Sequence, residues 1–274
     1  MTDRNTHHAR IQARFGAAAQ DYLTSPTHAT GDDLAQIVAW AAEGARGRVL
    51  DIATGAGHTA LALAPLFTCV IASDLTTPML MTARGAARER GMGNIIVCHA
   101  DAESLPFANE SFDVVTCRIA PHHFHHIDQF LAEVRRTLVP GGLFLLEDSV
   151  VPREPDLASF LNNVERLRDP THVRSLSTDE WCMLIEDAHL CIEDTRLFPK
   201  THALASWCDR ARVPAEVRRQ VEEAFRSAPP AVRAAFAIKV DASGRVESFS
   251  DQKLVLRARK ATRADRFRGR GGRS

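Results

Sequence analysis

Four histidines stand within one short segment of the chain, which reads RIAPHHFHHIDQF from residue 118 to residue 130. An unperturbed imidazole titrates near pH ~6.5, so a histidine here could remove a proton at neutral pH. The same segment could instead bind a metal ion or form an ordinary loop. Which of these applies depends on where the fold places the four side chains, which are His122, His123, His125 and His126.

A metal site needs ligands that converge on one point. Zinc sites usually combine well-separated ligands with a supporting carboxylate or thiolate, whereas these histidines are neighbours in two pairs whose side chains point in different directions. We therefore predict no functional metal. His123, and after it His122, are the candidates for a catalytic base, and His125 and His126 are expected to be exposed before the next helix.

A glycine pair marks a second chemical segment, VLDIATGAGHTALALA (residues 49–64). Gly55 and Gly57 let the backbone turn sharply and let a ligand approach where a Cβ would collide. With Asp74 about 20 residues later, the segment fits a dinucleotide-binding fingerprint. Asp51 departs from that fingerprint, because an acid inside the strand can face a cationic ligand. This segment alone therefore leaves two interpretations open, a dinucleotide site and a site for a cationic ligand.

Short apolar runs alternate with helical stretches from residue 48 onward. This order is typical of a parallel sheet with helices on both faces, the α/β class. The histidines follow the fourth run, so they are expected at the carboxyl edge of the sheet, where open α/β folds bind ligands. Glu147 and Asp148 end the fifth run and could assist proton removal there. The runs are RVLDIA, CVIASD, IIVCHAD, DVVTCRIA and GLFLLEDSVV.

Helical periodicity predicts the elements around these runs. Apolar residues recur at helical spacing after a cap at Asp32, and again from Ile127 to Leu138 after the histidine segment. Pro140 and the two glycines that follow it are expected to end that second helix.

The chain divides into three expected regions. Residues 1–45 form an N-terminal helical lid segment, residues 46–260 form the main domain, and the Arg/Gly-rich residues 261–274 form a disordered tail. Helical inserts near 152–190 and 201–241 are expected to cap the acceptor site. Phe160, Trp181 and Trp207 lie in these inserts and either wall an apolar site or pack in the core.

Composition limits the classes of partner. The 34 basic and 34 acidic side chains balance, which argues against nucleic acid as a partner. The six cysteines form no C-x-x-C pair, which is typical of a reducing cytosol. No segment approaches the ~20 apolar residues of a membrane span. We expect a cytoplasmic protein without a membrane span.

Four motifs together resemble those of the class I S-adenosylmethionine-dependent methyltransferases. They are VLDIATGAG, ASDLTTPML, DAESLPFANESFDVV and LVPGGLFLLED, and the resemblance covers roughly residues 22–260. It is closest to the small-molecule branch similar to the ubiquinone/menaquinone methyltransferases. The resemblance implies a Rossmann-like, doubly wound, seven-stranded sheet that is mostly parallel with an antiparallel last strand. Ala53 departs from the pattern, because many members carry glycine there.

The resemblance implies a role for each residue near the methionine end of S-adenosylmethionine. Gly55 and Gly57, with Ala53 beside them, would line the methionine portion. Asp51 would order its ammonium group, and Arg118 would lie under the same portion of the cofactor.

The adenosine end is assigned in the same way. The resemblance implies that Asp74 accepts hydrogen bonds from both ribose hydroxyls and that Leu75 flanks the adenine. Asp101 would bind the exocyclic amine of the adenine, with Ala102 beside it. The resemblance also implies that an N-terminal segment closes over the cofactor. Two residues of this segment, Tyr22 and His28, would contact the cofactor.

The reaction implied by the resemblance is an in-line transfer of a methyl group to an O, C or N atom of a small molecule, aromatic or quinone-like, with S-adenosylhomocysteine as the product. A histidine base would assist acceptors that must lose a proton. Two alternatives stay open: an NAD(P)-dependent oxidoreductase and a noncatalytic S-adenosylmethionine-binding protein. The oligomeric state is also open, with a homodimer among the options.

Overall fold

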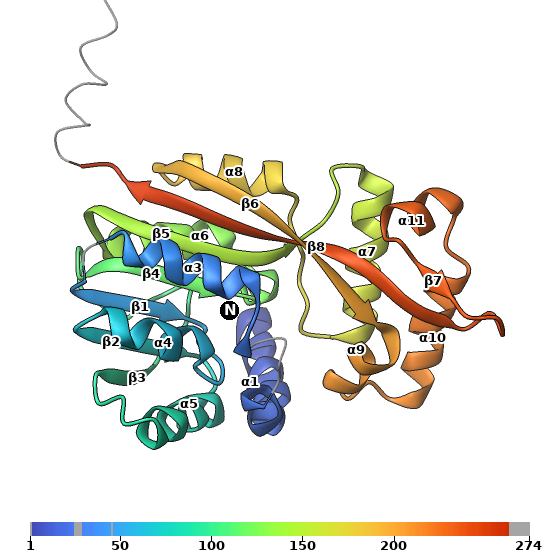
Figure 1. Cartoon of the computed structure of the whole chain (residues 1–274), viewed down its shortest axis with the longest axis horizontal. Helices are drawn as coiled ribbons and strands as arrows, with labels where there is room; N and C mark the ends of the chain where they lie inside the picture. Colours follow the sequence, from blue (N-terminus) through green and yellow to red (C-terminus); the bar gives the residue numbers. More distant parts are fainter. Residues whose placement is uncertain (1, 25–28, 45, 263–274) are drawn as a thin grey trace, which may run out of the picture.

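The computed structural model describes residues 2–24, 29–44 and 46–262, with an eight-stranded sheet as its central layer (Figure 1). The strand order is β3-β2-β1-β4-β5-β8-β6, and the short β7 pairs with β8 outside this path. β1 to β5 are parallel, whereas β8 runs antiparallel to both β5 and β6. The mostly parallel sheet with an antiparallel last strand is therefore confirmed, with the expected seven strands on the main path and β7 as an eighth beside it. The strands are β1 (Arg48–Ile52), β2 (Cys69–Asp74), β3 (Ile95–His99), β4 (Phe112–Arg118), β5 (Leu138–Val150), β6 (Leu190–Ala203), β7 (Lys239–Val240) and β8 (Val246–Lys260).

Helices cover both faces of the sheet because successive strand residues point to opposite sides. In β1, Val49 packs with α3 and α4, whereas Leu50 packs with α6 and α8. Both residues are fully buried. The helices of this layered part are α3 (Asp32–Ala42), α4 (His58–Leu63), α5 (Thr77–Glu89), α6 (Ile127–Thr137) and α8 (Thr178–Asp187).

A separate hydrophobic cluster forms a cap beyond the end of the sheet. β6 and β8 are long enough to extend past their neighbours, and their distal halves carry the cap with β7 (Figure 1). Trp207, Phe225 and Phe249 are buried at its centre. The cap helices are α7 (Pro155–Arg168), α9 (Leu204–Arg210), α10 (Ala215–Arg226) and α11 (Pro230–Ala235).

Only part of the first expected insert lies in the cap. α7 packs there, and Phe160 contacts Phe225 with ring centroids 5.6 Å apart. α8 instead packs on the sheet beside α6, where Trp181 is buried in the main core. The expectation that the whole of 152–190 caps the acceptor site was wrong for α8, because its apolar face completes the sheet core.

The N-terminal helix α1 (Thr2–Leu23) bridges the sheet layer and the cap (Figure 1). Gln12 Nε2 donates to the carbonyl of Leu75, 3.0 Å away, after β2. On its other side Arg14 donates to the carbonyls of Arg168 and Ala211 in the cap. This position places α1 across the carboxyl edge of the sheet.

Two expected boundaries were wrong. α6 ends at Thr137, and Pro140 to Gly142 lie inside β5, since Leu138 already pairs with Phe112 and the register shifts before Val114. Asp32 begins α3 instead of capping it, because Gly31 occupies the cap position.

No helix within the described ranges is both long and apolar enough to cross a membrane. Residues 263–274 of the predicted tail lie outside the described residues.

Candidate functional site

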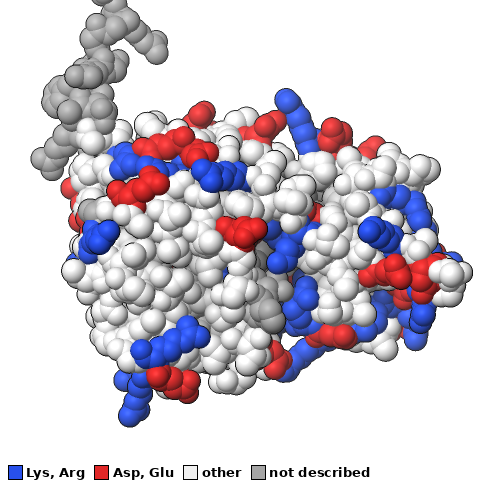
Figure 2. All heavy atoms as spheres, viewed as in Figure 1, with Lys and Arg blue, Asp and Glu red and all other residues white. Residues whose placement is uncertain are grey.

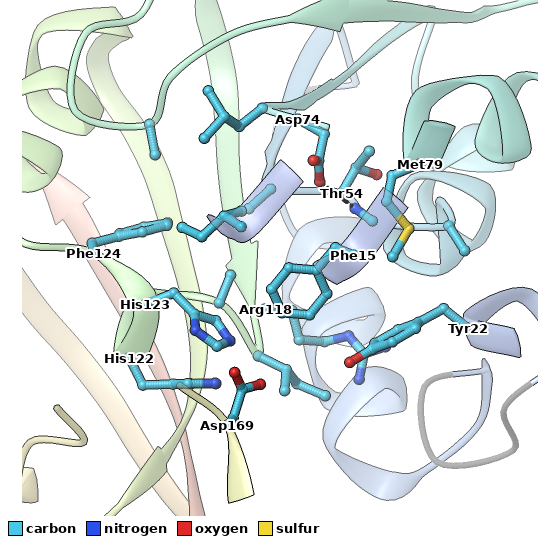
Figure 3. Close-up of a pocket in the computed structure, with 18 of the residues that line it drawn as sticks. Phe15, Tyr22, Thr54, Asp74, Met79, Arg118, His122, His123, Phe124 and Asp169 are labelled. Carbon is cyan, nitrogen blue, oxygen red and sulfur yellow. Dashed lines mark hydrogen bonds between the residues drawn. The ribbon is translucent and has the colours of Figure 1, made fainter. Parts of the chain in front are cut away.

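A pocket opens at the carboxyl ends of β1, β2 and β4, between the sheet, α1 and the cap (Figure 3). Its empty space, including the part open to solvent, is about 1670 Å³. Most of the predicted site residues line this one pocket. They are Tyr22, Asp51, Ala53, Gly55, Asp74, Leu75, Asp101, Ala102, Arg118, His122 and His123. His28 lies outside the described residues.

The loop after β1 turns through two left-handed residues, Ala53 (φ 52°) and Gly55 (φ 54°). The backbone N–H of Gly55 donates to Asp74 Oδ2 at 2.9 Å, which ties the loop to the end of β2. A Cβ on Gly55 would meet no atom within 4 Å, so the glycine leaves open space beside the pocket. The left-handed φ of Ala53 explains why the family pattern favours glycine there.

Gly57 is not among the residues that line the pocket, and its contact with the ligand stays a prediction. It caps α4 with φ 90°, and a Cβ there would lie 2.8 Å from the Cβ of Ala83 on α5. The glycine is required by its left-handed backbone and by close packing between α4 and α5.

Asp51 is a buried carboxyl group at the centre of the pocket wall. Thr54 Oγ1 donates to its Oδ2 at 2.6 Å, and Thr116 Oγ1 donates to its Oδ1 at 2.7 Å. Burial raises the pKa of Asp51 to about 6, although both hydroxyl donors and the charge of Arg118 lower it. No basic side chain of the described ranges pairs with Asp51 within ion-pair distance. The site therefore suits a cationic ligand group.

Two further acids lie along the ends of β2 and β3. Asp74 accepts from the backbone N–H of Thr76 as well as Gly55, and burial raises its pKa. Asp101 accepts from the backbone N–H of Glu103 at 2.9 Å and forms an ion pair with Arg4 of α1. This ion pair holds α1 at the ends of β2 and β3.

Arg118 is buried under the pocket and links three elements. Its Nε donates to Thr59 Oγ1 at 3.0 Å, and its Nη1 donates to Asp33 at 3.1 Å and to Glu147 at 3.2 Å. Burial raises the pKa of Glu147 to about 8 despite the charge of Arg118. Neither Glu147 nor Asp148 lines the pocket itself, and each contacts it through one lining residue, Glu147 through Arg118 and Asp148 through His122. Adjacent strand residues point to opposite faces, so Glu147 lies toward Arg118 and the start of α3, whereas Asp148 lies toward His122.

His122 is held by a buried carboxylate. Its Nδ1 lies 2.6 Å from Asp148 Oδ1, and Asp148 is 1% exposed. Because a carboxylate only accepts, Nδ1 carries a proton, and in the neutral imidazole Nε2 has the free lone pair. Burial alone would lower the pKa of His122, but the charge and the hydrogen bond of Asp148 more than offset it and raise the pKa.

His123 is a much weaker base. Its Nδ1 donates to the carbonyl of Thr171 at 2.9 Å, and its ring lies edge-on to Phe15 with centroids 5.1 Å apart. Burial, together with the neighbouring His122, lowers the pKa of His123 to about 4. The raised pKa makes His122 the stronger base of the two, whereas the sequence ranked His123 first. Among the described residues, no group of three or more potential ligands is arranged to bind a metal.

Several pocket residues were missed by sequence reasoning. Ile11 and Phe15 come from α1, and their spacing of four on one helix face was the available signal. Arg168 and Arg210 come from the cap helices, and Lys253 comes from β8. No local pattern marks these three, because only the packing of the cap against the sheet brings them to the pocket.

Comparisons with known proteins agree on one family. The family model of a methyltransferase domain matches residues 49–142. The chain is similar to the uncharacterized methyltransferase YcgJ of Bacillus subtilis (strain 168), with 36% identity over 242 residues, which cover 88% of this chain and 96% of the relative. The crystal structure of the Bacillus subtilis YcgJ protein superposes with a TM-score of 0.81 and covers 84% of this chain and 98% of that one.

A second relative bears the name of the branch that the motifs resemble. The demethylmenaquinone methyltransferase of Thermus thermophilus is 40% identical over 117 residues, which cover 41% of this chain and 52% of the relative.

Proposed function

Because the chain belongs to the class I S-adenosylmethionine-dependent methyltransferases and is an enzyme with S-adenosylmethionine as its cofactor, we propose that it methylates an O, C or N atom of a small-molecule acceptor with His122 as the base. The observation that carries this proposal is the His122–Asp148 hydrogen bond, which lies at the pocket that also contains Asp51 and Asp74. The two alternatives, an oxidoreductase and a noncatalytic binding protein, gain no support from the methyltransferase relatives described above.

The pocket fits the charge of S-adenosylmethionine. The cofactor supplies an electrophilic methyl group on a cationic sulfonium and also carries an ammonium group. Asp51 is a buried acid without a described cationic partner, and a cation beside it would favour its ionised form. We place the ammonium end near Asp51 and the Gly55 loop for this reason.

The adenosine end would lie between β2 and α1. Asp74 accepts one backbone hydrogen bond on each oxygen, and each oxygen keeps a second lone pair that can accept from a ribose hydroxyl. Leu75 and Ala102 line the same side. Asp101 is bound by Arg4, so we propose that this ion pair closes α1 over the adenine.

His122 would take up the proton that an acceptor loses. Asp148 fixes the imidazole with Nε2 as the free nitrogen and stabilises the imidazolium that forms. His123 stays neutral and shapes the same wall with Phe15. The chain would also position the acceptor and exclude water, because α1 and the cap enclose the pocket.

A crystal structure of the complex with S-adenosylhomocysteine tests the cofactor placement. We expect the amino group of the product beside Asp51, its ribose hydroxyls on Asp74 and its sulfur on the side of the pocket that holds His122. The free protein grown under the same conditions is the control. A complex with the ribose away from Asp74, or with the product outside this pocket, would show that the assignment is wrong.

A further inference from the structure

Three basic side chains line the pocket from the cap helices and β8. Lys253 forms an ion pair with Asp251 at 3.1 Å and also donates to Ser149. Arg168 forms an ion pair with Glu165 at 3.2 Å and stacks over the ring of Trp207. Two of the three positive charges are therefore balanced within the protein.

Arg210, the third, has no such balance. It is half-buried and lines the pocket, and no hydrogen bond or ion pair joins it to any other described residue. Burial and the neighbouring charge of Arg168 lower the pKa of Arg210, and the more weakly coupled charge of Glu165 offsets this only in part. A partly desolvated guanidinium beside a second one is unfavourable in the free protein, and a bound anion would relieve that cost.

A second pocket, on the outer side of α1, also contains Arg210 in its lining. It shares Phe15, Tyr22 and Arg210 with the main pocket, and its described lining holds no acidic residue. Arg14 in this second pocket is paired with Asp169, but Arg10 has no partner among the residues that the structure covers. Figure 2 shows basic side chains at the boundary between the sheet and the cap. Such a pocket attracts anionic ligands.

Ring-bearing side chains wall the space beside Arg210. Phe15 and Tyr22 have ring centroids 5.8 Å apart, and Trp207 lines the same pocket from α9. These faces suit a flat apolar body, whereas the guanidinium suits an oxyacid group at its end.

We propose that the methyl acceptor is a small ring-containing molecule with a carboxylate or phosphate group, and that Arg210 binds this group. The proposal rests on the function proposed above and names its acceptor class. A carboxylate and a phosphate offer the same paired oxygen atoms to a guanidinium, so the test separates them.

Calorimetric titration of the protein saturated with S-adenosylhomocysteine tests the proposal. The probes are benzoate, phenyl phosphate and the uncharged benzyl alcohol. We expect benzoate or phenyl phosphate to bind at least about 10-fold more tightly than benzyl alcohol, because a hydrogen-bonded charge pair in a half-buried site is worth a factor of that order. Whichever anion binds more tightly identifies the oxyacid group.

The variant Arg210→Gln should abolish this preference. Its affinity for S-adenosylhomocysteine and its thermal midpoint should stay at or above the wild-type values, since Arg210 pairs with no other residue that the structure describes. Arg219→Gln is the matched control, because it removes an exposed charge from the same cap outside both pockets. Equal affinities for the three probes, or an unchanged preference in Arg210→Gln, would overturn the proposal. Methyl transfer to macromolecules only would contradict the proposed function instead, whatever the probes show.

Discussion

Replacing His122 with glutamine should lower the apparent kcat at pH 7 by about 100-fold or more, the usual contribution of a general base. Glutamine keeps much of the size and polarity of the side chain but cannot accept a proton. The affinity for S-adenosylmethionine should stay within a few-fold of wild type, because His122 lies on the acceptor side of the pocket. The measurement is the initial rate of S-adenosylhomocysteine release with a saturating metabolite extract as the source of acceptor.

The pH profile separates a base from a packing residue. A base works when deprotonated, and the pKa of His122 is raised by Asp148 despite burial, so wild-type kcat should rise with pH through a value above ~6.5. Asp148→Asn should slow the reaction and shift this rise to lower pH. His123→Gln is the control and should keep the profile, since the pKa of His123 is about 4. A His122→Gln variant with wild-type rate and profile would exclude the base.

Replacing Asp51 with asparagine should weaken binding of S-adenosylmethionine at pH 7 by about 100-fold, because a buried charge-assisted contact is worth about 1.5–3 kcal/mol. The wild-type affinity should also fall as the pH drops through about 6, where the Asp51 carboxyl of the free protein takes up a proton. The affinity of the variant should not depend on pH in that range. Calorimetric titration from pH 5 to pH 8 measures both effects.

The stability of the ligand-free protein tests the raised pKa of Asp51 independently of cofactor binding. Its pKa is about 6 in the folded chain against 3.8 as the ordinary value, so ionising it costs the folded state about 3 kcal/mol above pH 6. The free energy of unfolding of the ligand-free protein should therefore fall as the pH rises from about 4 to about 6. In Asp51→Asn, this fall with pH should be smaller by the part that Asp51 causes. A variant that binds S-adenosylmethionine as tightly as wild type would remove Asp51 from the site.

Much of the site could be predicted because its residues follow one another at the ends of successive strands. Asp51, Asp74 and Asp101 end or follow apolar runs that the sequence shows clearly, and parallel strands bring such ends to one edge. The same logic placed His122 and His123 there. For Gly57 the sequence could not show which neighbour excludes a Cβ, because a bound ligand and a packed helix both require a glycine, and the structure shows the helix.

The choice between the two histidines could not be made from the sequence. It depends on Asp148, which lies 26 positions from His122 along the chain, and on Thr171, which lies 48 positions from His123. Arg210 reaches the pocket only because β6 and β8 carry the cap beside α1. Such long-range contacts leave no local periodicity to detect.

Mass spectrometry of a metabolite extract incubated with the enzyme and S-adenosylmethionine labelled in its methyl group tests the central claim most directly. The extract should come from the organism that carries the gene, and a reaction with His122→Gln serves as the control. We expect one small molecule to gain the labelled methyl group with wild-type enzyme, and about 100-fold less of it to form with the variant in the same time. Label that enters only protein or nucleic acid, or a product that forms equally fast with both enzymes, would contradict the account.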